Sequence, residues 1–282
     1  MRVLIAGCGY VGRELALRLV AGGHAAWGLS RHPAGLPPGV QPFAADLTDR
    51  ATLRGLPAGL DAVVHAAAAN GPTEPFYRAA YLDGPRNLLA ALAEQGQAPR
   101  RVLTVSSTGV FPQRDGSWVD EASPAAPEDV LGRVMVEGEQ AVLGGPFPAV
   151  VLRLAGIYGP GRTLWIDRVR EGTARRPPPG SWTNRIHRDD AARAIAHLLA
   201  LDAPEPLYIG VDDEPAELAD VLAFLAEQLG VAPPPPEPDG AAGGPMRGRG
   251  TKRCSNRRLR GSGFSLLYPT YREGYGALLA AS

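Results

Sequence analysis

The chain has 282 residues, of which 45% are hydrophobic and 21% are charged, so it can bury the core of a globular protein. Its 29 Lys and Arg residues balance 29 Asp and Glu residues, which leaves no overall charge to draw it to nucleic acid or an anionic membrane. Cys8 and Cys254 are too few for a disulfide framework and lack metal-ligand spacing, so we expect a cytoplasmic protein without a bound metal.

Short apolar runs alternate with helical patterns through the first half of the chain. Strands are predicted at residues 3–6, 25–29, 40–44, 62–66, 102–105 and 149–152, and helices at residues 11–20, 86–94 and 137–143. Glycines cut the first run short, so we expect neither a secretion signal nor a membrane span there. Because parallel neighbours need crossover connections, the alternation predicts an α/β fold with a doubly wound parallel sheet.

The second half is less regular. Strands near residues 184–186 and 207–209, with a helix at 191–201, are expected to extend the same sheet, and residues 162–180 are expected to lie outside it. Residues 232–250 are rich in Pro and Gly, which predicts an exposed and partly extended loop.

A glycine-rich turn, Gly7-Cys8-Gly9-Tyr10-Val11-Gly12, joins the first predicted strand to the first helix. In this context Gly7 permits a tight turn, Gly9 lets a pyrophosphate approach the backbone, and Gly12 lets helix and strand pack closely. Free N–H groups and the helix dipole favour the anion. We therefore predict that this turn, including Tyr10 and Val11, binds NAD(P); the alternative is a Rossmann-like fold with a vacant site.

Residues after the next strands bear on the choice of cofactor. Many NAD sites carry an acidic residue after the second strand, whereas this chain has Ser30-Arg31. Arg31, assisted by Arg13, can hold a 2′-phosphate, so NADP is predicted with NAD as the alternative; solvated surface is the other interpretation of both arginines.

Two further strand ends complete the predicted cofactor site. Asp46-Leu47 offers a carboxylate and an apolar wall to adenine, although Asp46 is equally placed to cap a helix from residue 49 onward. The small residues Ala66 and Ala67 let the cofactor lie flat, and His65 before them is more typical of a structural histidine.

The chain resembles the NAD-dependent epimerase/dehydratase branch of the short-chain dehydrogenase/reductases. The matching segments are Gly7-x-Gly9-x-x-Gly12, Asp46-Leu47, His65-Ala66-Ala67, Asp83-Gly84-x-x-Asn87, Ser106-Ser107-Thr108-Gly109, Arg153-x-x-Gly156-Ile157-Tyr158-Gly159 and Ile186-His187-Arg188-Asp189-Asp190. Residues 252–256 and 268–274 resemble an atypical subgroup. The resemblance implies a Rossmann-type NAD(P)-binding domain at 1–160, its sheet completed by 182–211, and a small C-terminal substrate lobe formed by 161–181 and 212–282.

The resemblance breaks at the proton-transfer pair. The family places Tyr-x-x-x-Lys on the helix after the fifth strand, where the lysine lowers the tyrosine pKa. Here those positions hold Leu131 and Met135, and Lys252 is the only lysine in the chain. Ser107 matches the family's hydroxyl that polarises the substrate carbonyl, so it is the one predicted catalytic residue; a strand-end hydroxyl that satisfies a turn is the alternative.

Other groups offer weaker candidates for the chemistry. Tyr158 has Arg162 four residues on, but an arginine keeps its proton. Nothing in the sequence separates Tyr81, Glu137 and His187 as proton donors.

Residues 247–260 form a basic run, which is either a solvated face or a contact for the phosphates of a nucleotide-linked substrate. Its members are Arg247, Arg249, Lys252, Arg253, Arg257, Arg258 and Arg260.

Two functions are consistent with these residues. The first is an NAD(P)-dependent oxidoreductase of the epimerase/dehydratase type, which transfers hydride at a carbon bearing oxygen while Ser107 orients that oxygen on a small-molecule substrate. The second is a non-catalytic NAD(P)-binding redox sensor or interaction module, which fits the missing pair. The resemblance also implies a homodimer formed through residues 86–95 and 128–143.

Overall fold

The computed structural model describes residues 1–238 and 251–281. Its centre is a seven-stranded sheet in the order β11-β7-β5-β4-β1-β2-β3, and every pairing within it is parallel. The strands are β1 (Arg2–Ala6), β2 (Ala25–Ser30), β3 (Gln41–Ala44), β4 (Ala62–His65), β5 (Arg101–Ser107), β7 (Ala149–Leu154) and β11 (Leu207–Gly210). The predicted doubly wound sheet is therefore confirmed.

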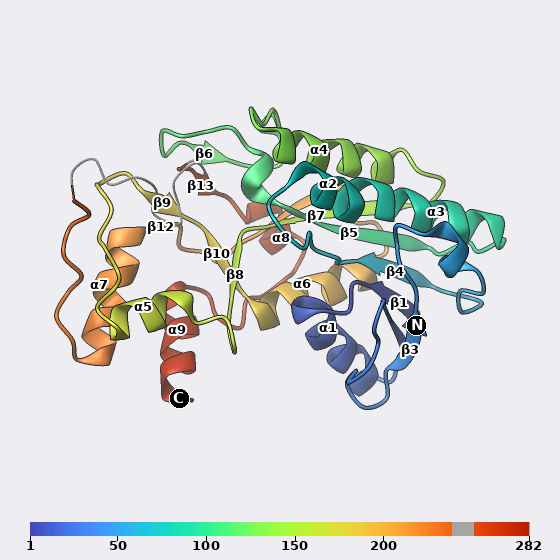
Figure 1. Ribbon diagram of the computed structural model, residues 1–282, viewed down its shortest axis with the longest axis horizontal. Helices are drawn as coiled ribbons and strands as arrows, with labels where there is room; N and C mark the ends of the chain where they lie inside the picture. The colour runs from blue at the N-terminus through green and yellow to red at the C-terminus, as the bar shows by residue number, and fades with distance from the viewer. Residues whose placement is uncertain (239–250, 282) are drawn as a thin grey trace.

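Helices cover both faces of this sheet (Figure 1). On one face lie α1 (Tyr10–Ala21) and α6 (Arg188–Ala200), whose apolar side chains share a core with β1, β4 and β5. On the other lie α3 (Gly84–Glu94) and α4 (Val130–Leu143). The central strands are apolar on both sides because both sides are covered; Val3 to Ala6 of β1 are fully buried.

Short elements connect these layers. A 3-10 turn, η1 (Arg50–Leu53), follows β3, and α2 (Glu74–Tyr77) runs through a π-helical segment, η2 (Arg78–Asp83), into α3. Another 3-10 turn, η3 (Thr108–Val110), follows β5 directly. These turns stand at the carboxyl ends of the strands, the edge at which open α/β sheets bind ligands.

A smaller lobe lies beside that edge, at the left of Figure 1. Its helices α5 (Leu164–Arg170), α7 (Leu218–Leu229) and α9 (Tyr271–Ala280) share a separate apolar core. Two short pairs of strands accompany it, β9 (Trp182–Thr183) with β12 (Ala216–Glu217) and β6 (Trp118–Val119) with β13 (Arg253–Cys254). Helix α8 (Arg257–Gly261) packs back against β11.

Of the two strands predicted to extend the sheet, one does so and the other does not. The strand near 207–209 joins the sheet as β11. The strand near 184–186 forms β10 (Arg185–His187), which pairs with β8 (Gly156–Tyr158) in a separate parallel pair. β11 already occupies the edge of β7, so β10 cannot extend the sheet there. Most of the predicted loop at 232–250, namely residues 239–250, lies outside the described residues.

A buried ion pair joins the sheet to α4. Arg153 on β7 donates from Nη2 to Glu139 Oε2 at 2.6 Å and from Nε to Oε1 at 3.0 Å. The hydroxyl of Ser106 donates to the same Oε1 at 2.5 Å. All three side chains are buried, so the network fixes β5, β7 and α4 relative to one another in a low-dielectric setting.

Glu139→Ala should lower the free energy of unfolding by about 3 kcal/mol or more, because it leaves the Arg153 guanidinium buried without its carboxylate. Urea denaturation measures the loss. The control is Glu137→Ala on the same helix, whose exposed carboxylate meets Arg86 at 3.2 Å and Arg78 at 3.7 Å; it should cost less than about 1 kcal/mol. Equal losses in the two variants would contradict the role of the buried pair.

Candidate functional site

The three glycines of the N-terminal turn have different surroundings. Gly7 has φ +91°, and a side chain there would overlap the backbone of Ala67. A Cβ on Gly12 would lie 2.6 Å from the Gly7 carbonyl oxygen. Gly9 has no neighbour within 4 Å of such an atom. Gly7 and Gly12 are thus required by packing, whereas Gly9 presents open backbone at the start of α1, where a helix attracts anions.

Tyr10 connects this turn to a segment far away in the sequence. Its hydroxyl donates to the Pro160 carbonyl oxygen at 2.9 Å. The guanidinium carbons of Arg162 and Arg188 stand 4.1 Å and 5.4 Å from the ring centroid. Arg188 is also paired with Asp189 at 2.9 Å. The contact places the Arg162 cation over the side chain of Tyr10, the first residue of α1.

The ends of β2 and β3 lie side by side, because Ser30 is paired with Ala44. Arg31, which follows, is exposed. The Oδ1 atom of Asp46 accepts from the amide and hydroxyl of Thr48 at 2.9 and 2.7 Å, and these bonds, with a smaller effect of Arg31, lower the Asp46 pKa. A cation and a carboxylate therefore stand together at this edge.

Asp46 does not cap the helical turn that begins after residue 49; Asp49 caps it instead. Asp49 accepts from the Ala51 amide at 3.0 Å and caps η1. Leu47 packs against the core on the α3 side of the sheet. Arg13, proposed as an assistant to Arg31, donates to the Gly35 carbonyl oxygen at 2.8 Å, so it fastens the segment that follows β2.

Ser107 is the last residue of β5 and caps η3. Its Oγ accepts a hydrogen bond from the Gly109 amide at 3.0 Å. A hydroxyl has one donor hydrogen besides its acceptor lone pairs, so the turn and a substrate oxygen can be served together. His65 ends the neighbouring strand, fully buried, with Nδ1 3.0 Å from Thr104 Oγ1; burial lowers its pKa to about 4, which keeps the ring neutral.

The structure brings most of the predicted residues to one edge. Ser30 and Ser107 are the last residues of β2 and β5. The other predicted residues follow strands: the glycine turn follows β1, Arg31 follows β2, Asp46-Leu47 follows β3 and Ala66-Ala67 follows β4. Parallel strands order these ends side by side. Met135 is buried in an apolar cluster with Val110 and Phe111 of the turn that follows Ser107.

The other proton-donor candidates lie in different settings. Tyr158 is buried against Tyr275 in the lobe, with ring centroids 4.5 Å apart, and burial raises its pKa. His187 is buried and its Nδ1 accepts from the Asp189 amide at 3.2 Å, which caps α6. Glu137 is exposed and paired with arginines. Tyr81 lies in the π-helical segment, where burial raises its pKa.

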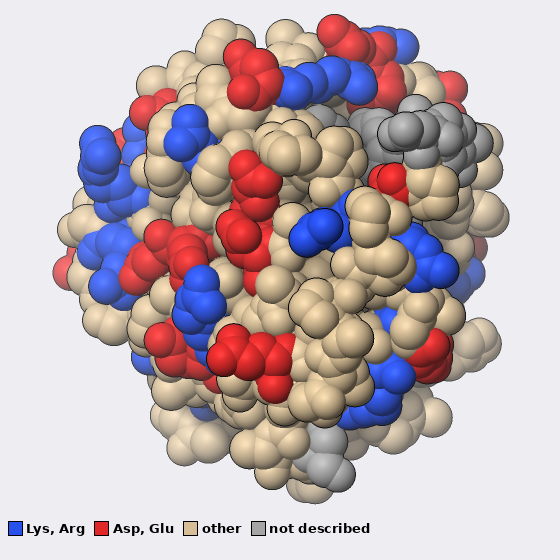
Figure 2. All heavy atoms as spheres, turned by 90° about the vertical axis from the view of Figure 1, so that its left-hand side faces the viewer, with Lys and Arg blue, Asp and Glu red and all other residues tan. Residues whose placement is uncertain are grey.

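The basic run divides into several environments. Arg258 and Arg260 stand 3.8 and 3.7 Å from Glu121 and Asp213, and Arg253 stacks between Trp118 and Trp182. Lys252 is only 4% exposed; Arg247 and Arg249 lie outside the described residues. On the lobe face, acidic and basic side chains are interspersed among the described residues (Figure 2). A contact between this run and substrate phosphates stays a prediction.

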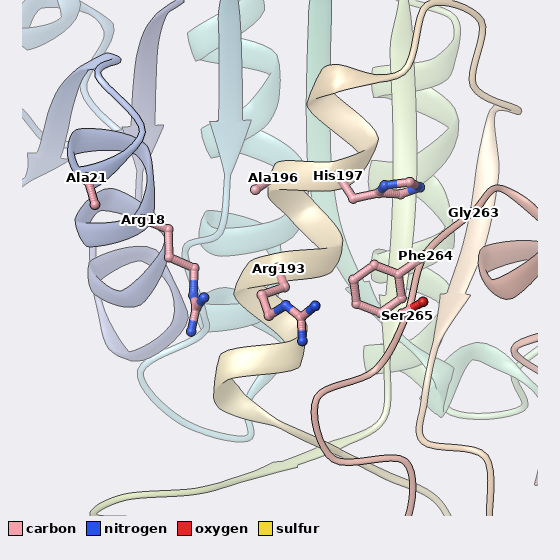
Figure 3. Close-up of a pocket in the computed structure, with 8 residues that line it drawn as sticks. All are labelled: Arg18, Ala21, Arg193, Ala196, His197, Gly263, Phe264 and Ser265. Carbon is pink, nitrogen blue, oxygen red and sulfur yellow. The ribbon is translucent and has the colours of Figure 1, made fainter.

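A hollow lies on the outer face of α1 and α6, at the end of α1 away from the glycine turn (Figure 3). It measures about 520 Å³. Its arginines already have carboxylate partners, Arg18 with Glu14 at 2.8 Å and Arg193 with Asp190 at 3.2 Å. We leave it out of the candidate site because these carboxylates neutralise its cations.

Within residues 1–238 and 251–281, no group of three or more His, Cys, Asp or Glu side chains is placed to hold a metal ion. In the same part of the chain, no helix has the length and apolar character needed to cross a bilayer.

Sequence reasoning considered Arg162 only as a partner of Tyr158 and missed its approach to Tyr10, which arises only through the fold. Its contact with Tyr10 joins residues about 150 positions apart, and no local pattern announces it. Lys252 did carry a signal, because it is the only lysine. Its proximity to the segment after Ser107 is visible only in three dimensions: its Nζ donates to the Phe111 carbonyl oxygen at 3.2 Å.

Comparisons with known proteins agree on one family. The model of the NAD dependent epimerase/dehydratase family matches residues 3–210. A 3-diazoavenalumate denitrifying reductase from a Streptomyces species is 31% identical and covers 98% of this chain and 99% of its own. A quinoline-oxide ketoreductase from Stigmatella aurantiaca is 30% identical over 82% of this chain and 74% of its own. A solved structure from Methylobacillus flagellatus, named for these epimerases/dehydratases, is 40% identical with a TM-score of 0.81, covering 99% and 98% of the two chains.

Proposed function

Because the chain belongs to the NAD dependent epimerase/dehydratase family, we propose that it is an NADPH-dependent reductase of a small molecule that carries a carbonyl or a related electrophilic group. The observation that carries the proposal is the open backbone of Gly9, in a turn whose Gly7 lies against the Ala66-Ala67 segment and which shares the carboxyl edge of the sheet with the Ser107 hydroxyl. Both curated relatives described above are named as reductases, which favours reduction over epimerisation.

The residues present fit a dinucleotide. Gly9 leaves the space that a Cβ would fill, the first turn of α1 offers N–H groups to a pyrophosphate, and Arg162 adds a cation there. Arg31 would meet a 2′-phosphate, and Asp46 with Leu47 would border the adenine. When bound, the reduced cofactor supplies hydride. Ser107 would donate its hydroxyl hydrogen to the substrate oxygen and stabilise the charge that develops there.

The substrate would lie between the sheet domain and the lobe. A hollow of about 540 Å³ lies along the β6–β13 pair and is lined by Trp118, Asp120, Asp212, Cys254 and Asn256 among others, but not by Ser107. Its size suits a small molecule. Solved relatives at 21% identity hold UDP-glucose or UDP-glucuronic acid with NAD, so nucleotide sugars belong in a substrate panel with ketones and aryl diazo compounds.

Gly9→Ala should weaken NADPH binding at least tenfold, because the added methyl occupies the space that the pyrophosphate needs. Isothermal titration measures the affinity. Gly276→Ala in α9 is the matched control, since its added methyl also has no neighbour within 4 Å; it should bind NADPH as the parent protein does. Unchanged affinity in a folded Gly9→Ala protein would remove the glycine turn from the cofactor site.

Arg31→Ala should raise the Kd for NADPH about tenfold or more and leave that for NADH nearly unchanged, because a charged hydrogen bond to the 2′-phosphate is worth about 1.5–3 kcal/mol. The exposed Arg54 serves as control, and its alanine variant should keep the parent's preference. If the parent protein binds NADH more tightly than NADPH, the assignment of NADP is wrong.

Ser107→Ala should lower kcat about 100-fold with little effect on the Kd for NADPH, because it removes a donor to the developing oxyanion. Oxidation of NADPH is followed with the substrate panel described above. The variant also loses the cap on Gly109, so its thermal midpoint is recorded alongside. Tight binding of NADPH without turnover of any substrate would instead favour the redox-sensor function.

A further inference from the structure

The single lysine stands out against the rest of the basic residues. The chain has 29 Lys and Arg residues, and Lys252 is the only lysine among them. Its side chain is buried, with 4% exposure. An arginine keeps its proton and needs room for a planar fork, whereas a lysine is compact and can release its proton when it is desolvated. Position 252 therefore holds a type of cation that this chain uses nowhere else.

The backbone on both sides of Lys252 is fixed. The side-chain amide of Asn184 donates to the Lys252 carbonyl oxygen at 2.9 Å, and its oxygen accepts from the Cys254 amide at 2.7 Å. Strand β13 is also paired with β6. These bonds aim the lysine side chain from the lobe toward the sheet domain.

The ammonium reaches the turn that follows Ser107. Lys252 Nζ donates to the carbonyl oxygen of Phe111 at 3.2 Å, and Phe111 ends the turn η3 that Ser107 begins. Cys254, two residues after the lysine, is hydrogen-bonded to Thr108 in the same turn. The lysine thus approaches within one short turn of the only hydroxyl that we assign to the substrate oxygen.

The residue that accepts from the ammonium belongs to an apolar cluster. Phe111, Cys254 and Met135 belong to one buried apolar cluster. Burial lowers the pKa of the Lys252 ammonium, Cys254 opposes this, and the nearby Arg114 guanidinium lowers it further. A desolvated ammonium loses its proton more readily than an exposed one.

On the basis of the reductase function proposed above, we propose that Lys252 is the acid that protonates the substrate oxygen held by Ser107. As hydride reaches the carbonyl carbon, the π electrons move to oxygen. The oxygen then takes a proton from the Lys252 ammonium, so that an O–H bond forms and an N–H bond breaks with its electrons left on nitrogen. The neutral amine regains a proton from water, and the products are the alcohol and the oxidised cofactor.

Variants at position 252 separate acid catalysis from a structural role. Lys252→Met should lower kcat about 100-fold while the Kd for NADPH stays within about twofold. Lys252→Arg should not restore kcat, because a guanidinium keeps its proton. Arg54→Met, at an exposed position in the sheet domain, is the control. Turnover retained in Lys252→Met, or restored in Lys252→Arg, overturns the assignment of Lys252 and leaves the reductase function standing.

The parent protein offers a measurement that does not depend on variants. Protein labelled with ¹⁵N-lysine gives one side-chain Nζ signal, because the chain has one lysine. The probe is oxidised NADP together with the best ketone of the panel, a pair that cannot react. The ketone should shift the Nζ signal and its titration midpoint relative to NADP alone. A signal indifferent to the ketone overturns the proposal, and absence of turnover by the parent protein overturns this proposal and the reductase function together.

Discussion

The buried pair between Arg153 and Glu139 is the interaction on which the site depends most. It joins β7 to α4, and the Ser106 hydroxyl brings β5 into the same network. Ser107 is the next residue along the chain, so its position at the end of β5 depends on the hydrogen bond between Ser106 and Glu139. An ion pair in this setting is expensive to break, because either charge left alone stays desolvated. The network therefore holds the end of β5 in one place.

The side of the edge at the glycine turn, where we propose that the cofactor binds, relies on shape more than on charge pairing. Gly7 and Gly12 are fixed by close backbone contacts, which leaves Gly9 as the open position between them. Tyr10, within the same turn, donates a hydrogen bond to Pro160, and the Arg162 guanidinium lies against its ring. The close packing of Gly7 and Gly12 shapes the turn. The positive charge comes from Arg162, which is distant in the sequence. A dinucleotide needs both.

The sequence predicted the main sheet well because buried parallel strands are short apolar runs between helical patterns. It failed for β10 because a strand of three residues does not reveal its partner, and only the three-dimensional arrangement shows that β11 holds the edge of β7. It was also predictable that the glycine turn, Asp46 and Ala66 would share one edge of the sheet, since each follows a strand; their role in binding a cofactor stays a prediction. The contacts of Arg162 with Tyr10 and of Lys252 with Phe111 were not predictable, because both contacts join segments over 130 residues apart.

The position of Lys252 directly before β13 has a consequence for how the two parts of the molecule work together. Ser107 belongs to the sheet domain, whereas the ammonium arrives with a strand of the lobe that pairs with β6 and is held by Asn184. Met135 and Phe111 belong to one apolar cluster. The Lys252 ammonium reaches this cluster from the lobe side through its hydrogen bond to the Phe111 carbonyl oxygen. Docking of the lobe would therefore both enclose the substrate and bring its acid into place, and displacement of β13 would remove the acid without disturbing the glycine turn. Coupling of this kind lets cofactor binding persist in states where proton transfer does not.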